Sequence, residues 1–380
     1  MSSIRHVAVM YGGPSAEHEV SCSSALSIIR ALDPERFAPI AIGITRERGF
    51  VLTPSHVVEE LRTPPTGGLA IEDRLPVTGI EVELRGTPDG RLEISELGKP
   101  QDVLAEADLV FPALHGPFGE DGVLQGVLET LGVPYAGNGV RASAVGMDKV
   151  NMKQAFIAEG IPITPHRWFD AGSWAAAPDD AAKAALVADL TFPLFVKPAS
   201  MGSSIGISRI ESVNELAAAV EEALTHDFRV IVEQGVTGRE LECSVLGGFQ
   251  PEASPVGEVT VHGGWFDYQQ KYHGTEDPMI VPAVLSETVA EEVRALSLAA
   301  FSAVGCWGLA RVDFLYDEEA GTVFVNELNT LPGFTAHSMY PKLWNAVGLD
   351  YPSLIGRLID LADERAALAV RMATPAAPDA

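Results

Sequence analysis

The chain has 380 residues, of which 47% are hydrophobic and 21% charged, a balance typical of a soluble α/β protein with more than one packed unit. The net charge of −26 argues against nucleic-acid binding, because contacts to phosphates need clustered Lys and Arg. No run approaches 18 apolar residues, the N-terminus lacks the apolar region of a signal peptide, and the three cysteines form no CxxC pair. We therefore expect a cytoplasmic protein without a membrane span, a zinc site or a disulfide framework.

The chain opens with the pattern of a βαβ unit. A strand is predicted over His6–Met10, a turn at Gly12-Gly13-Pro14-Ser15, a helix over about Glu17–Leu32 and a second strand over Ala38–Ile44. Because two strands joined through a helix usually run parallel, the pattern favours a parallel sheet in this first unit.

Residues 46–100 show little periodicity and contain several turn signals. A hairpin is predicted around Pro88-Asp89-Gly90, but the region offers no evident chemistry. The next buried strand, over Ala107–Ala113, runs into a glycine-punctuated loop, 114–122, which contains His115. Such loops often hold ligand contacts in α/β proteins, although a single histidine there is also common as a structural residue.

A second unit is predicted after the glycine-rich turn 136–139. Its strands are expected at Leu194–Lys197, Ile207–Ile210 and Val230–Glu233, and its helices near Asp148–Glu159, in the 180s and over Val213–Leu224. From about residue 234 the pattern becomes rich in strands, followed by a helix over Glu287–Val304, strands over Ala310–Tyr316 and Thr322–Glu327, and a helix over about 352–371. Residues 373–380 are rich in Ala and Pro, and we expect a disordered tail there.

The two late strands carry a candidate metal site. Glu327 and Asn329 are two residues apart, so they share one face of their strand, and Asp313 can face them if the two strands form a hairpin. Three oxygen ligands without His or Cys suit Mg²⁺. Solvated carboxylates at a polar strand end are the alternative, which the apolar surroundings LARVDFLY and TVFVNELN disfavour.

A candidate phosphate-binding loop follows the strand that ends at Lys197. The segment KPASMGSSIG, residues 197–206, combines a lysine with small residues whose backbone N–H groups can surround a phosphate. The segment is neither a Walker A loop nor a Rossmann fingerprint. An ordinary flexible loop fits the segment equally well by itself, but together with a magnesium site it predicts binding of a nucleoside triphosphate.

Several motifs occur in the order found in one enzyme family. They are GGPSAEHEVS (12–21), HGPFGEDGVLQG (115–126), MDK (147–149), VKPASMGSSIG (196–206), VEQ (232–234), DYQQKY (267–272), ARVDF (310–314) and NELNTLPGFTAHS (326–338). Together they resemble the D-alanine–D-alanine ligase family of the ATP-grasp superfamily, over about residues 5–365. The resemblance implies a Rossmann-like N-terminal domain with a parallel sheet and two α+β domains that clamp ATP. We place these domains at 1–137, 138–233 and 234–372.

The resemblance also implies the reaction and its requirements. ATP would phosphorylate the carboxylate of a first D-alanine, and the amine of a second D-alanine would attack this acyl phosphate, giving a peptidoglycan precursor. Two Mg²⁺ ions, for which Mn²⁺ can substitute, would be held by Asp313, Glu327 and Asn329. A homodimer is expected from the family.

The matching positions imply a nucleotide site. Lys149 and Lys197 would bind the α- and β-phosphates, Lys271 would face the γ-phosphate, and the loop 202–206, with Ser204, would close over the nucleotide. The adenine would be bound by Glu233, Gln234 and Val236, and the ribose by Glu240. Gln234 replaces a lysine that some members carry, which leaves recognition of adenine to the backbone there.

The matching positions also imply two amino-acid subsites. Glu17 would receive the ammonium group of the first D-alanine and, with Ser203 and Tyr272, orient it, and His115 would lie nearby. The oxyanion would be held by Arg311 and the backbone of Gly333. Ser338 and Met339 would bind the carboxylate of the second D-alanine.

Three alternatives remain at this stage. A relative that uses D-lactate or D-serine as its second substrate would keep the same fold, although Tyr272 favours D-alanine over D-lactate. Another ATP-grasp carboxylate–amine ligase would lack the segments GGPSAEHEVS and HSM. A nucleotide-binding module without catalysis would have no need of Arg311 together with the metal ligands.

Overall fold

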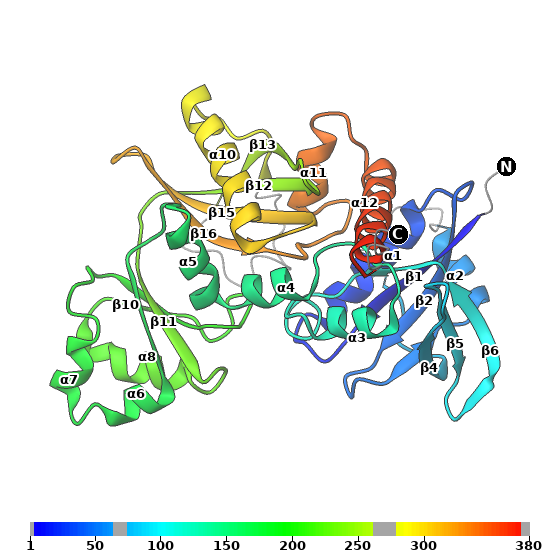
Figure 1. The fold of residues 1–380 in the computed structure, drawn as a ribbon. Helices are drawn as coiled ribbons and strands as arrows, with labels where there is room; N and C mark the ends of the chain where they lie inside the picture. The colour runs from blue at the N-terminus through cyan, green and yellow to red at the C-terminus, as the bar shows by residue number, and fades with distance from the viewer. Residues whose placement is uncertain (1–3, 64–73, 261–278, 374–380) are drawn as a thin grey trace, which may run out of the picture.

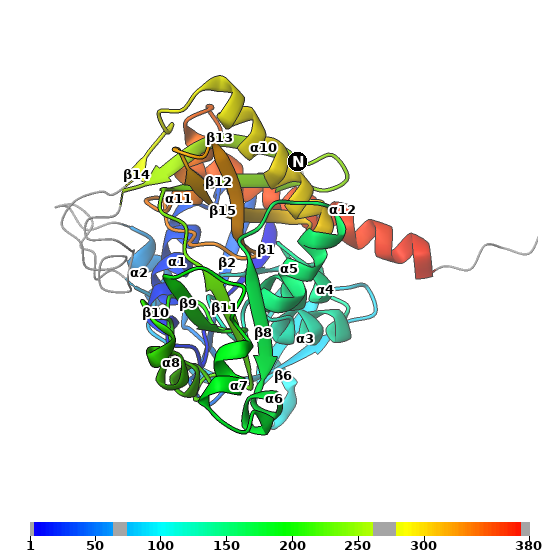
Figure 2. The same ribbon diagram turned by 90° about the vertical axis from the view of Figure 1, so that its left-hand side faces the viewer.

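The computed structural model describes residues 4–63, 74–260 and 279–373. Within these residues the chain builds a 7-stranded, a 4-stranded and a 5-stranded sheet, one after another along the sequence. Figure 1 shows the helices α6, α7 and α8 of the central unit on the side that faces away from the other two sheets. Figure 2 shows the central sheet below the C-terminal sheet, with the N-terminal sheet behind both.

The parallel start of the N-terminal sheet is confirmed. β1 (Arg5–Gly12) pairs in parallel with β2 (Phe37–Ile44) and with β7 (Leu109–Pro112), and α1 (His18–Ala31) connects the first two strands. Residues Val7 to Tyr11 are buried, so both faces of β1 are covered, as is usual for a strand in a parallel sheet.

The poorly patterned region extends this sheet with antiparallel strands, so the sheet as a whole is mixed. β3 (Phe50–Leu52), β4 (Ile80–Gly86), β5 (Leu92–Glu96) and β6 (Lys99–Ala107) continue from β2 in that order. α2 (Ser55–Arg62) follows β3. The hairpin predicted at Pro88-Asp89-Gly90 is confirmed, because β4 and β5 pair across a turn in which Gly90 has a φ of +83°.

The central unit begins with a run of short helices and then forms its own sheet. α3 (Val123–Leu131) still belongs to the N-terminal core, to which it contributes Leu124 and Leu128, and the central unit begins with α4 (Val140–Met147) and α5 (Lys149–Ala158). The sheet order is β10 (Ser208–Ile210), β9 (Leu194–Pro198), β11 (Arg229–Gln234) and β8 (His166–Asp170), all antiparallel. α6 (Ala171–Ala176), α7 (Asp180–Ala185), the 3₁₀ turn η1 (Val213–Glu215) and α8 (Leu216–Ala223) complete the unit.

The C-terminal sheet is antiparallel and carries the predicted hairpin. Its order is β14 (Met279–Ile280), β13 (Glu252–Val259), β12 (Arg239–Gly247), β15 (Gly308–Asp317) and β16 (Thr322–Asn329). The apolar face of α10 (Glu287–Val304), including Val293 and Phe301, packs with Val245, Val312 and Phe314 of the sheet in one core. α11 (Met339–Asn345) and α12 (Tyr351–Ala373) end the described chain.

The last helix packs on the first unit. Leu354 and Leu358 of α12 belong to the same core as Leu26 and Ile29 of α1, and Figure 1 shows the two helices side by side. The guanidinium of Arg5 in β1 donates two hydrogen bonds, of 2.5 and 2.9 Å, to the carboxylate of Asp363. The C-terminal helix therefore completes the core under the N-terminal sheet.

No helix in the described part of the chain has the length and apolarity needed to cross a bilayer. The three cysteines, Cys22, Cys243 and Cys306, are buried in the cores as free thiols.

Candidate active site

The hairpin that was predicted to hold the metal ligands is present. β15 and β16 pair antiparallel, with Asp313 opposite Glu327 and Arg311 opposite Asn329. The amide Nδ2 of Asn329 donates a hydrogen bond of 2.9 Å to Oδ2 of Asp313. The alternation along both strands therefore brings these four side chains to one face, as period-two geometry requires.

A bulge interrupts the hairpin beside these residues. Asp313 pairs with Glu327 but the next residue, Phe314, pairs with Val325, so Asn326 has no partner residue in β15. One extra residue in a strand bends it and increases its twist, and bulges often turn a side chain toward an active site.

Arg311 compensates the carboxylates of the sheet. Its Nε and Nη2 donate to the two oxygens of Asp313, each at 2.7 Å, and Nε lies 2.9 Å from Oε2 of Glu242 on β12. Burial opposes the charge on the guanidinium, but Asp313 and then Glu242 outweigh it and hold the pKa of Arg311 above its ordinary value. Arg311 is therefore a permanently charged donor on the same face as Asp313.

Lys149 joins the hairpin to the candidate phosphate loop. It is the first residue of α5, whose N-cap Asp148 accepts hydrogen bonds from the N–H groups of Val150 and Asn151. Its Nζ donates to the carbonyl of Met201 at 2.8 Å and lies 3.3 Å from Oε2 of Glu327. One ammonium group thus contacts both sides of the candidate site.

Lys197 is paired with Glu233 across the central sheet. Nζ of Lys197 donates to Oε2 of Glu233 at 2.5 Å, and Lys153 lies 2.8 Å from the other carboxylate oxygen. Burial would raise the pKa of Glu233, but the two lysines outweigh burial and hold it well below its ordinary value. Glu233 also outweighs the effect of burial on Lys197, whose pKa is raised.

The predicted adenine segment, residues 233–236, leads from the central sheet to the C-terminal sheet. The N–H of Gln234 donates to the carbonyl of Pro165 at 2.9 Å, and the N–H of Gly235 donates to the carbonyl of Pro193 at 2.8 Å. The side-chain oxygen of Gln234 accepts a hydrogen bond from the N–H of Thr191. Val236 lies between these bonds and β12, in which Glu240 pairs with Val259 and Leu315.

Glu17 and Ser203 meet, although they are far apart in the sequence. Oγ of Ser203 donates to Oε1 of Glu17 at 2.5 Å. Ser203 and Ser204 have φ values of +51° and +59°, a left-handed conformation that costs residues with a side chain some free energy. A cavity of about 300 Å³ opens beside this contact, lined by Glu17, Arg48 and Gly202 among other residues.

His115 is held from three sides next to Glu17. Its Nε2 lies 2.9 Å from Oγ of Ser24, its Nδ1 lies 3.2 Å from the carbonyl of Leu331, and its own carbonyl accepts from Ser15 at 2.7 Å. Burial lowers the pKa of His115, more than the nearby Glu17 raises it, so the neutral imidazole is favoured.

Gly333 and Ser338 lie in one turn before α11. Oγ of Ser338 accepts from the N–H of Thr335 at 3.1 Å and lies 2.9 Å from its hydroxyl. A Cβ on Gly333 would lie 3.3 Å from Oγ of Ser338, a tight approach, so the turn suits a glycine. The Met339 side chain is buried with Val259, which leaves its backbone at the start of α11 as the part that can face a ligand.

The donor set suits a hard cation. Asp313 and Glu327 supply carboxylate oxygens and Asn329 an amide oxygen, at one strand end whose positive neighbours are Arg311 and Lys149. Oxygen donors of this kind suit Mg²⁺ or Mn²⁺. Within the described residues no group of three His, Cys, Asp or Glu side chains could hold a metal ion. The candidate site therefore needs the amide oxygen of Asn329 as its third ligand.

Three residues near the site were not predicted as site residues: Lys153, Glu242 and Glu120. Lys153 is one helical turn after Lys149, and Glu242 stands opposite Asp313 in β12, so spacing and register are the signals for these two. Glu120 accepts from the N–H of Gly116 at 2.8 Å, and burial, followed by the charge of Glu17, raises its pKa to about 8.

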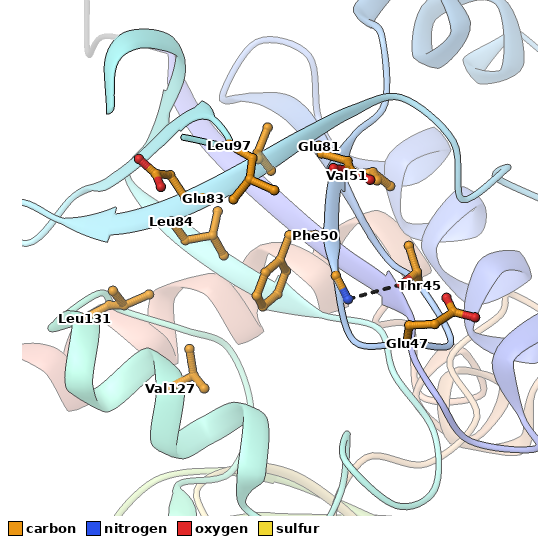
Figure 3. A pocket seen from close by; sticks show the side chains of 12 residues that line it. Thr45, Glu47, Phe50, Val51, Glu81, Glu83, Leu84, Leu97, Val127 and Leu131 are labelled. Carbon is orange, nitrogen blue, oxygen red and sulfur yellow. Dashed lines mark hydrogen bonds between the residues drawn. The ribbon is translucent and has the colours of Figure 1, made fainter. Parts of the chain in front are cut away.

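Two predicted site residues, Lys271 and Tyr272, lie outside the described residues. A further cavity, of about 650 Å³, lies in the N-terminal unit between β3, β4 and α3. Its apolar wall includes Phe50, Leu84 and Val127, as Figure 3 shows, and it contains none of the predicted site residues.

Comparisons with known proteins cover nearly the whole chain. Residues 6–138 match the family model described as D-ala D-ala ligase N-terminus, and residues 155–360 match D-ala D-ala ligase C-terminus. A D-alanine–D-alanine ligase from Mycobacterium sp. (strain KMS) is 46% identical over 374 residues, which cover 94% of this chain and 96% of the relative. One from Mycolicibacterium smegmatis is 46% identical over 373 residues, 94% and 95% of the two chains.

Solved structures agree in fold. The D-alanine–D-alanine ligase from Coxiella burnetii superposes with a TM-score of 0.80 and 33% identity, covering 98% of this chain and 97% of that one. The VanG D-Ala:D-Ser ligase from Enterococcus faecalis gives a TM-score of 0.78 and 32% identity, with 95% and 100% of the chains covered.

Proposed function

The chain belongs to the D-alanine–D-alanine ligase family, with its ATP-grasp fold, and we propose that it joins two D-alanine molecules in an ATP-dependent reaction. One observation carries the proposal: Lys149 contacts both the phosphate-loop carbonyl of Met201 and the hairpin carboxylate of Glu327. A triphosphate bound at Lys149 would therefore lie beside Arg311 and within reach of the Glu17 side of the site.

The nucleotide would lie between the central and C-terminal sheets. Lys149 and Lys197 supply positive charge for the α- and β-phosphates, and the loop with Ser204 would cover them. Glu233, Gln234 and Val236 would contact adenine, with the backbone of this segment as its recognition element, and Glu240 would contact the ribose. We also keep Lys271 as the proposed contact of the γ-phosphate.

The hairpin would hold the metal. Asp313, Glu327 and Asn329 are proposed to bind two Mg²⁺ ions, or Mn²⁺ in their place, which neutralise phosphate charge as the phosphoryl group moves. Arg311 compensates Asp313 by a bidentate contact, so the site is not left with uncompensated negative charge before ATP binds.

The first step would take place beside Glu17. Its carboxylate would receive the ammonium group of the first D-alanine, while Ser203 and the proposed Tyr272 orient it. A carboxylate oxygen of this D-alanine attacks the γ-phosphorus, and ADP leaves. The neutral His115 adds no charge to the subsite; its Nδ1–H donates to the carbonyl of Leu331, and its Nε2 accepts from the hydroxyl of Ser24.

The second step would use the turn before α11. The amine of the second D-alanine attacks the acyl carbon, the oxyanion is stabilised by Arg311 and the backbone N–H of Gly333, and phosphate leaves as the amine loses its proton. Preorganised donors of this kind supply about 3–4 kcal/mol each. Ser338 and the backbone of Met339 would bind the carboxylate of the second D-alanine.

The remaining expectations complete the proposal. Three domains would divide at about residues 137 and 233, the protein would act in the cytoplasm as a homodimer, and its dipeptide would enter peptidoglycan synthesis.

The proposal is tested with purified protein, ATP, Mg²⁺ and D-alanine. We expect release of one phosphate per D-alanyl-D-alanine formed, identified by mass. D-Serine or D-lactate supplied with D-alanine tests the rival second substrates, of which D-serine corresponds to the VanG relative. Phosphate release that requires D-serine or D-lactate would contradict the substrate, and no turnover with any D-amino acid would contradict the function.

A further inference from the structure

Lys153 is a buried lysine that the proposed reaction does not use. It is 0% exposed and lies in α5, four residues after Lys149, so both lysines project from the same side of the helix. Its Nζ lies 2.8 Å from Oε1 of Glu233 and donates a hydrogen bond of 3.2 Å to the carbonyl of Asn326. A fully buried ammonium group of this kind needs partners, and it has two.

The first partner, Glu233, is shared with Lys197. The two lysines contact different oxygens of one carboxylate, at 2.8 and 2.5 Å, and Glu233 itself is 3% exposed. A buried carboxylate that loses its only cation is left as an uncompensated charge, which strongly disfavours that state. With Lys153 in place, Lys197 can turn from Glu233 toward a phosphate and leave the carboxylate compensated.

The second partner, Asn326, is the residue without an opposite partner in the β15–β16 bulge. Its carbonyl receives the Lys153 hydrogen bond, and the next residue is Glu327. α5 makes a further contact at the same place, because the N–H of Leu328 donates to Sδ of Met152 at 3.2 Å. Lys153 therefore links Glu233 on the nucleotide side to the strand that presents Glu327.

We propose that Lys153 is a positioning residue for ATP, acting as the fixed counter-ion of Glu233 that releases Lys197 to bind the triphosphate. This inference rests on the proposed function, since it assigns Lys197 to the phosphates. Lys153 cannot contact the nucleotide itself, because its ammonium is enclosed by Glu233 and Asn326. Its effect passes through Lys197 and through the bulge at Asn326.

The first experiment replaces the ammonium group while keeping the unbranched stem, as Lys153→Met. Glu233 would then depend on Lys197 alone, which would hold Lys197 away from the phosphates. We expect the Kd of Mg-ATP, measured by titration calorimetry, to rise about tenfold or more. The KM for D-alanine should stay within about twofold of wild type. Lys99→Met, which removes an exposed lysine paired with Glu96, is the matched control and should leave both constants unchanged.

The second experiment removes the carboxylate as well. In the Glu233→Gln background no buried charge competes for Lys197, so adding Lys153→Met should change the Kd of Mg-ATP by less than about threefold. This double variant also covers the case in which Lys153→Met alone fails to fold, because it removes both members of the pair. An equal loss of ATP affinity with and without Glu233 would overturn the proposal. A lower melting temperature with unchanged ATP affinity would likewise assign Lys153 a purely structural role.

The binding measurement separates this proposal from the proposed reaction. Calorimetry with Mg-ATP requires no turnover, so a wild-type protein that binds ATP without ligating D-alanine contradicts the reaction and still tests Lys153. A wild-type protein that ligates D-alanine, with a Lys153→Met variant of normal ATP affinity, contradicts the inference alone.

Discussion

The hairpin β15–β16 and the loop 199–206 meet at Lys149, but they are held in place in different ways. In the hairpin, a ladder interrupted by one bulge supports Asp313, whose carboxylate accepts hydrogen bonds from both Arg311 and Asn329. In the loop, Ser203 and Ser204 adopt left-handed backbone conformations, and the contacts to Glu17 and Lys149 come from residues of the site itself.

The difference separates two kinds of contribution to activity. The hairpin has its charges arranged before any ligand binds, which is the arrangement that stabilises charge developing in a transition state. The loop is bonded to Glu17 through Ser203 and to Lys149 through the carbonyl of Met201. A ligand that binds Glu17 or Lys149 therefore replaces a contact that holds the loop in place. We therefore expect changes in the hairpin to affect turnover, and changes in the loop to affect substrate binding.

Arg311→Met should have the largest effect. It removes the proposed oxyanion donor and the cation beside Asp313 and Glu242, so kcat should fall about 10²–10³-fold. The two carboxylates lose their partner, and the melting temperature should fall as well. The measurements are steady-state ligation and thermal unfolding. Arg209→Met, in an exposed pair with Glu211, is the control that should change neither; a kcat within tenfold of wild type would contradict the role of Arg311.

Asn329→Ala should have the next largest effect. It removes the amide that bonds to Asp313, so the Mg²⁺ concentration for half-maximal turnover should rise about 10–100-fold while the unfolding midpoint changes little. Thr322→Ala, at the opposite end of β16, is the matched control. Equal losses of metal response and of stability would mean that Asn329 serves the fold rather than the metal.

Ser203→Ala tests the loop side. Losing the hydrogen bond to Glu17 should raise the KM for D-alanine about tenfold, with kcat reduced less, since the hairpin is untouched. Ser203→Gly removes the same bond but relieves the left-handed backbone, so it should unfold at a higher temperature than Ser203→Ala. A fall in kcat without a change in KM would contradict the expectation that the loop acts on substrate binding and the hairpin on turnover.

Glu120→Gln should have the smallest effect, visible as a pH dependence. The pKa of Glu120 is raised to about 8, above its value in the unfolded chain, so the folded state holds this proton more tightly. The free energy of unfolding should therefore fall as pH rises from about 4.5 to about 8, by at most about 1.4 kcal/mol for each pH unit. Urea unfolding at pH 5, 7 and 9 should show a flatter profile for Glu120→Gln. The exposed Glu221→Gln should retain the wild-type profile, and an unchanged slope in Glu120→Gln would contradict the assignment.

The hairpin was predictable because its signal is local. Side chains alternate between the two faces of a strand, so Arg311 and Asp313 share one face of LARVDF, and Glu327 and Asn329 share one face of NELN. One short turn then brings the two strands together. Lys153 was not predictable in this way. Its partners lie 80 and 173 positions further along the chain, as Glu233 and Asn326, and a lysine in a helix is usually exposed.

The fold shows a similar division. The βαβ start and the helix over Glu287–Val304 have clear periodicity, and both are confirmed. The strands β3 to β6 were missed apart from the hairpin, because β6 is exposed over most of its length and β4 buries little beyond Val82. Strands at the outer part of a sheet with few buried positions leave little hydrophobic pattern to read.

The packing of α12 on α1 makes the first sheet dependent on a helix that lies more than three hundred residues further along the chain. During translation the N-terminal unit emerges with Leu26 and Ile29 of α1 uncovered, until more than two hundred further residues have followed and Leu354 and Leu358 arrive. A fragment that ends near residue 137 would keep this apolar face exposed and be prone to aggregate, while one that adds α12 as a separate peptide could cover it. The contact between Arg5 and Asp363 therefore forms late, after more than three hundred residues have separated the two.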